Sequence, residues 1–89
     1  MQDLKAAGER ERIRFVENEI DLSTTFLDLA RTEATMNEPA AVKSLMEKAR
    51  LGFDTAGRFL NGIESTEARE RLRTKHDHLA RLLSAATAT

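Results

Sequence analysis

Residues 9–36 read ERERIRFVENEIDLSTTFLDLARTEATM, and this stretch decides the predicted fold. At 100° per residue its apolar side chains fall on two adjacent helical stripes. The first stripe holds Ile13, Val16, Ile20, Leu27, Ala30 and Ala34, and the second holds Phe15, Leu22, Phe26, Leu29 and Met36. A helix with one neighbour needs only about 100° of apolar surface, whereas these stripes cover roughly half the circumference. We therefore expect a long first helix with two neighbours, which are either two helices of its own chain or one of them and a second molecule.

Composition limits the classes of protein that this chain can belong to. Its 89 residues form a single domain, and 33% charged residues with only 4 Gly and 1 Pro favour an all-α fold. The absence of cysteine excludes disulfides and thiolate metal sites, which favours a reducing, cytoplasmic setting. No apolar run approaches the roughly 18 residues of a membrane span, and residues 1–8 lack the apolar core of a signal peptide. We expect a cytoplasmic protein with no membrane partner.

The segment after the first helix predicts a reversal and a second helix over residues 39–61. Asn37 is a good cap, and Pro39 is tolerated in a first turn. Gly52 and Gly57 lie inside this helix, where they allow either close helix packing or a gap for a ligand, and we favour packing. Leu51 stands alone on the polar side and could belong to an oligomer contact. The expected core stripe consists of Val42, Leu45, Met46, Ala49, Phe53, Ala56, Phe59 and Leu60.

A third helix is predicted over residues 66–86. Gly62 should end the preceding helix in a left-handed conformation, and Ser65 or Thr66 should cap the new one. Its apolar stripe consists of Ala68, Leu72, Leu79, Leu82, Leu83 and Ala86. The sequence thus predicts an antiparallel three-helix bundle, up-down-up, with helices at about 9–36, 39–61 and 66–86.

Two features, one before the first helix and one at its middle, refine this prediction. Residues 1–8 should be a polar lead that frays. Residues 23–25 (Ser-Thr-Thr) can bend a helix, because hydroxyl groups bond back to the carbonyl one turn earlier. We expect no complete break, since the apolar spacing continues in phase through them.

The distribution of charge predicts which helices are neighbours. Residues 9–36 hold 7 acidic against 4 basic residues, whereas residues 65–89 hold 5 basic against 3 acidic. The first and third helices should therefore lie side by side. The basic residues of the third helix do not form one stripe, and no aromatics accompany them, so we expect no nucleic-acid partner.

His76 and His78 are the only histidines, and they are the strongest candidates for chemistry. On a helix they point about 200° apart and cannot share one metal ion, so we expect no metal site and no cofactor. His76, followed by Asp77 and near basic residues, has the minimal chemistry of a phosphoacceptor, but a half-exposed boundary residue is the favoured interpretation. Residues 9–13, ERERI, resemble the opening of the dimerisation helix of sensor histidine kinases, yet Asn18 and Glu19 occupy the positions of its His-Asp pair, and no family is assigned.

The functional prediction is a small, non-enzymatic helical interaction module with no catalytic residue. Its candidate partner-binding residues are Phe15, Leu22, Phe26 and Leu29, on the second stripe of the first helix. The partner is a protein, either a second copy in a homodimer or a helix of another protein. The alternative from a different class is a histidine phosphotransfer-like signalling protein that uses His76.

Overall fold

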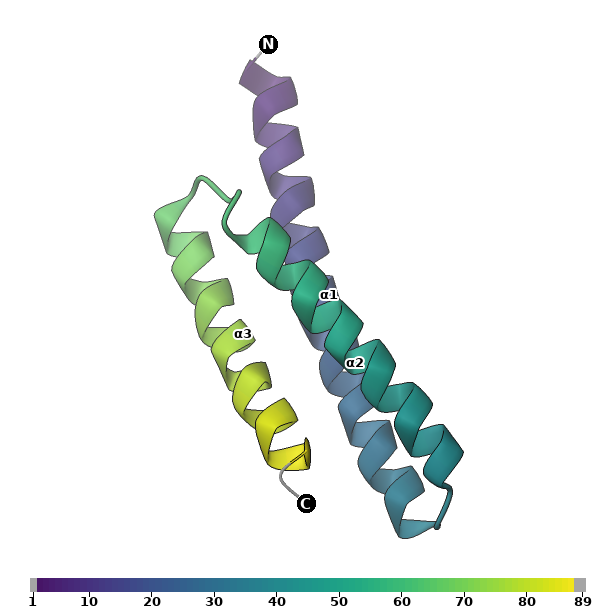
Figure 1. The fold of residues 1–89 in the computed structure, drawn as a ribbon. Helices are drawn as coiled ribbons and strands as arrows, with labels where there is room; N and C mark the ends of the chain where they lie inside the picture. The colour runs from purple at the N-terminus through teal and green to yellow at the C-terminus, as the bar shows by residue number, and fades with distance from the viewer. Residues whose placement is uncertain (1, 88–89) are drawn as a thin grey trace.

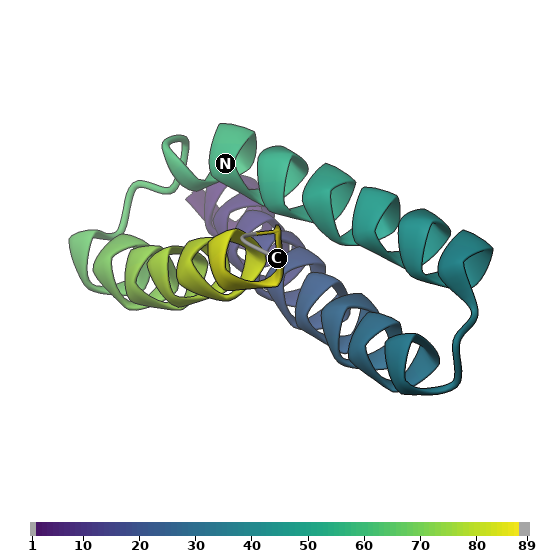
Figure 2. The same cartoon turned by 60° about the horizontal axis from the view of Figure 1, so that its bottom comes forward.

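A computed structural model describes residues 2–87 as three helices, with side-chain surroundings given from Gly8 onward. The helices are α1 (Gln2–Thr35), α2 (Pro39–Leu60) and α3 (Thr66–Thr87), and the described residues form no strand. In Figures 1 and 2 α1 and α2 form a long antiparallel hairpin, and α3 packs along one side of it. The all-α three-helix bundle with a long first helix is therefore confirmed.

α1 begins earlier than the sequence predicted and runs without interruption. The described part of the polar lead, from Gln2, is helical, so the prediction of a start near Glu9 was wrong. The Thr24 hydroxyl donates to the Ile20 carbonyl at 2.9 Å, and the Thr25 hydroxyl donates to the Asp21 carbonyl at 3.1 Å. Because these hydroxyls are satisfied within the helix, α1 passes through them unbroken.

The turn between α1 and α2 is closed by Asn37, which adopts a left-handed conformation with φ 59°. The amide of Asn37 donates to Ala34 O at 3.3 Å, and the amide of Glu38 donates to Glu33 O at 3.1 Å. This pattern is a Schellman motif, in which asparagine tolerates the left-handed position. Asn37 thus ends α1, and the prediction that it caps the second helix was wrong; Pro39 begins α2 as expected.

The turn between α2 and α3 differs from the expected glycine cap. No described glycine has a positive φ, and Gly62 N–H instead donates to Phe59 O at 3.1 Å in a tight 3₁₀-type turn. This turn satisfies the final carbonyls without a left-handed residue, so the predicted conformation of Gly62 was wrong. Ile63 then folds back into the core, and the Ser65 hydroxyl accepts the Ala68 N–H at 3.2 Å, which confirms the cap on α3.

The core lies where the three apolar stripes meet. It consists of Val16, Ile20 and Leu27 from α1, Ala49, Ala56 and Leu60 from α2, Leu72, Leu79 and Leu83 from α3, and Ile63 from the connecting turn. Ala34 belongs to the same predicted stripe but is exposed, because α3 ends before it reaches the α1–α2 turn (Figure 2).

The two glycines inside α2 serve close packing, as we expected. A Cβ at Gly52 would overlap Ser23 Oγ and lie 3.3 Å from the Glu19 carbonyl oxygen. A Cβ at Gly57 would lie 3.2 Å from His76 Nε2. Gly52 therefore lets α1 approach α2, and Gly57 makes room for the ring of His76 from α3.

Candidate interaction surface

Within the described part of the chain, five large apolar side chains of α1 and α2 remain 39–65% exposed, and we call them the outer face. They are Phe15 (39% exposed), Leu22 (49%) and Leu29 (46%) from α1, with Leu51 (65%) and Phe59 (46%) from α2. Isolated exposed leucines are common on soluble proteins, but a row of large apolar residues on two neighbouring helices marks an interaction surface.

Helical spacing explains why the α1 residues escape burial. Phe15, Leu22 and Leu29 recur every seven residues, so they share one side of the helix. The core residues Val16, Ile20 and Leu27 lie on the adjacent stripe, where α2 and α3 cover them. Met36 continues the row and is also exposed. Phe15 contacts Phe59 of α2 and Phe26 packs against the core, so the described chain covers the second stripe of α1 only in part.

The two rows of the outer face are held together by contacts between α1 and α2. The rings of Phe15 and Phe59 pack edge to face, with their centroids 5.1 Å apart. Three turns farther along, the Lys48 ammonium lies 5.7 Å from the centroid of the Phe26 ring, over its face. These pairs place Phe15 level with Phe59, and Phe26 level with Lys48.

Phe26 behaves differently from the other three predicted partner-binding residues. It is partly buried and packs against the core, whereas Phe15, Leu22 and Leu29 are exposed. Beside it a pocket of about 310 Å³ opens between α1 and α2. Leu22, Phe26 and Leu51 are among its lining residues, together with Ser23 and Gly52. Phe26 thus lines the pocket beside the outer face and is not one of its exposed side chains.

Sequence reasoning missed the contribution of α2 to this surface. Phe59 was assigned to the core stripe, and that assignment was wrong, because it lies at the stripe's edge and turns toward Phe15. Leu51 was singled out as a lone exposed residue, but it lines the same pocket as Leu22. The alignment of α1 with α2 would have identified Phe59 and Leu51 as members of this surface. That alignment follows from the close approach of Ser23 to Gly52, which the sequence alone does not give.

The contact of α1 with α3 is electrostatic at its margin, as the charge distribution predicted. Arg71 donates to the Glu17 carboxylate at 2.7 Å, and Lys75 lies 2.8 Å from Asp21 and 3.3 Å from Glu17. The hydrogen bond from Arg71 holds the pKa of Glu17 below its ordinary value, against the opposing effect of burial. The hydrogen bond to Asp21 raises the pKa of Lys75.

Glu9 anchors the turn that leads into α3. Its carboxylate accepts the amides of Glu64 and Ser65, each at 2.9 Å. Arg12 donates to the Gly62 carbonyl at 3.2 Å, and Arg69 donates to the Ile63 carbonyl at 2.8 Å. Backbone groups that no helix uses are thus satisfied from α1 and α3. This arrangement fixes the start of α3 against α1, away from the outer face.

His76 lies at the contact between α2 and α3 and is half-buried, as the favoured interpretation predicted. Its ring stacks on Phe53 with centroids 4.1 Å apart and an interplanar angle of 6°. Its Nε2 lies 2.9 Å from the Phe53 carbonyl oxygen, to which it must carry a proton in order to bond. Nε2 then has no free lone pair for a phosphoryl group, and Nδ1 is the ring nitrogen that carries one. His78 is exposed.

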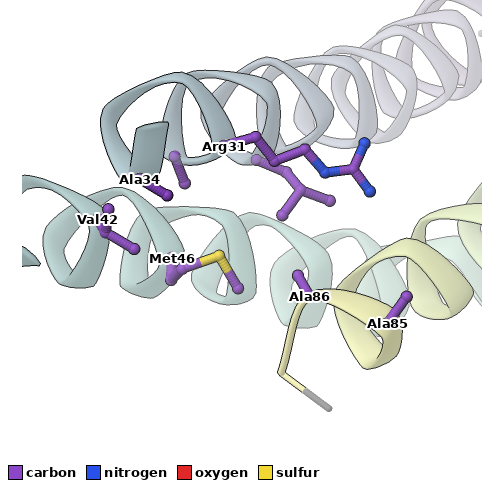
Figure 3. Close-up of a pocket in the computed structure, with 8 residues that line it drawn as sticks. Arg31, Ala34, Val42, Met46, Ala85 and Ala86 are labelled. Carbon is purple, nitrogen blue, oxygen red and sulfur yellow. The ribbon is translucent and has the colours of Figure 1, made fainter. Parts of the chain in front are cut away.

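A second apolar depression lies between the α1–α2 turn and the end of α3. It measures about 330 Å³ and is lined by residues of all three helices, among them Ala34, Val42, Met46 and Ala86 (Figure 3). It arises because α3 is shorter than the hairpin it covers. Among the described residues that line it, Arg31 alone is charged.

The described residues contain no group of three His, Cys, Asp or Glu side chains arranged to hold a metal ion. None of the three helices, over the same residues, combines the length and the apolar character that a membrane crossing requires. Comparison with protein-family models, with curated proteins and with solved structures gives no match.

Proposed function

We propose that this chain is a non-enzymatic helical interaction module that docks a helix of a protein partner on its outer face. The observation that carries the proposal is the uncovered double row of Phe15, Leu22 and Leu29 beside Leu51 and Phe59. Apolar anchors on a helical surface are the features by which grooves recognise amphipathic helices.

The arrangement of α3 supports this assignment of the surface. Glu17 and Asp21 of α1 bind Arg71 and Lys75 of α3, so α3 is committed to a different side of the hairpin. The Glu9 anchor holds α3 in that position at its first turn. The outer face is thus left for an external partner. Because its side chains are already about half covered, their complete burial contributes about half of the roughly 1.5–3 kcal/mol that a fully exposed side chain would give.

Position-specific photo-cross-linking in cells tests the proposal. A photoreactive amino acid at Leu22 or Leu51 should give protein adducts, whereas the same group at Arg81, exposed on α3, should not. Leu29→Glu should lower the yield from position 22, with Arg73→Glu on α3 as the matched control. Equal adduct yields from the three positions, or none from the outer face, would refute the proposal.

A further inference from the structure

We infer that the occupant of the outer face is a second copy of this chain, with α1 of each copy packed antiparallel on α2 of the other. This inference rests on the proposed function. It commits to a symmetric dimer in which the two hairpins form a four-helix core and the two α3 helices lie outside it.

The exposed area and the radius of gyration show that the chain is elongated. A folded monomer of 10.0 kDa exposes about 5,200 Å² by the usual size relation, whereas this chain exposes 6136 Å². The radius of gyration is 15.0 Å, against about 12 Å for a compact domain of this length. The chain is therefore elongated, and its long α1–α2 hairpin exposes more surface than a compact domain of the same mass.

The charges beside the outer face select the arrangement. By helical spacing, acidic Glu11, Glu19 and Glu33 lie beside the α1 row, where Glu11 is paired with Arg14 at 3.9 Å, and basic Lys48 and Arg58 lie beside the α2 row. Glu47 and Asp54 lie about 20° and 40° farther around α2 than Arg58, on the side turned away from α1. Packing α1 against the same helix of a second copy would bring acidic residues together, whereas packing it on α2 brings Glu19 of one copy near the height of Arg58 of the other.

Because the α1 side and the α2 side of the outer face complement each other, two copies of this face can pack together in a symmetric dimer. A closed two-fold contact requires a surface that matches itself. A two-fold axis parallel to the helices exchanges the acidic α1 side with the basic α2 side and keeps each residue at its own height along the rod. Because Ser23 is level with Gly52, Leu22 of one copy then lies over Leu51 of the other.

The absence of cysteine allows a clean test with single-cysteine variants. Leu22→Cys and Leu51→Cys are purified separately, mixed, and treated with a short bis-maleimide cross-linker. We expect covalent dimers in the mixture at several-fold the yield of either variant alone. Arg81→Cys mixed with Leu51→Cys is the matched control and should give none above background. Circular dichroism of the helical signal checks that each variant is folded. We expect the fold to tolerate these substitutions, because all three positions are exposed.

Two other results would refute the inference, and a third would show that the partner is a different protein. Efficient cross-linking of Leu22→Cys alone means that α1 packs on α1 and refutes the arrangement. A monomeric parent chain in sedimentation, with no cross-linking in the mixture, refutes the second copy as occupant. Adducts of another mass from position 22 in cells would then leave the proposed docking function standing with a different partner.

Discussion

Gly52→Ala should destabilise the fold, although the same substitution in a helix interior is ordinarily favourable. Alanine gains about 1 kcal/mol over glycine from helix propensity. Here the added methyl group would overlap Ser23 Oγ and lie 3.3 Å from the Glu19 carbonyl oxygen. The hydroxyl of Ser23, which is 1% exposed, would have to rotate among buried neighbours, and the Glu19 carbonyl is backbone that cannot rotate away. Overpacking of this kind costs about 1–3 kcal/mol, so we expect a net loss of about 1 kcal/mol.

Gly8→Ala is the matched control, because no atom lies within 4 Å of a Cβ built on Gly8. It should gain up to about 1 kcal/mol, so the two variants should differ by about 2 kcal/mol. For a domain of this size that difference corresponds to roughly 8–16 °C in Tm. Thermal and urea unfolding should be followed by circular dichroism, since the chain has no Trp or Tyr. Protein concentration must be matched, because association adds to apparent stability.

A double-mutant cycle identifies Ser23 as the cause. Ser23 Oγ is buried and has no hydrogen-bond partner among the described residues, so Ser23→Ala alone should be neutral or stabilising by about 1 kcal/mol. In that background Gly52→Ala should cost about 1 kcal/mol less than in the parent. A Gly52→Ala variant as stable as Gly8→Ala, or a cycle with no coupling, would refute the close approach of α1 and α2 at this point.

Three further predictions concern the other contacts of the fold. Glu17→Gln should lower stability at pH 7 by under about 1 kcal/mol. Because the folded pKa of Glu17 is lowered, this contribution is present above its unfolded pKa and should vanish as pH falls through the folded value, which unfolding at several pH values checks. Glu9→Gln should cost about 0.5–2 kcal/mol and speed amide exchange at Ser65, whereas Glu11→Gln, at an exposed position, should change neither. Incubation with a labelled phosphodonor should label the parent and His76→Gln equally; labelling lost in the variant would instead support phosphotransfer.

Helical periodicity was sufficient to predict the fold class because each stripe extends over many turns. The core positions of α3 were all placed correctly, and the charge difference between the first and third segments identified their contact. The turns were harder to predict. Asn37 and Gly62 are both residues that tolerate a left-handed backbone, and local sequence does not say which turn requires one.

Of the two rows of the outer face, the sequence predicted only the one on α1. The row on α1 follows from its own spacing, but the row on α2 depends on how the two helices are rotated about their axes. Ser23 and Gly52 set that rotation by meeting at close range, which turns Phe59 and Leu51 outward. The Glu9 anchor likewise joins residues 55 or more positions apart and has no signal in the local sequence.

Sedimentation over a concentration series, from low to high micromolar, tests the central claim most directly. The parent chain should sediment as a dimer, and Leu22→Glu should shift it to the monomer while its helical content stays the same. Arg73→Glu, exposed on α3, should leave the dimer intact. A parent chain that remains monomeric at high micromolar concentration would contradict self-association through the outer face.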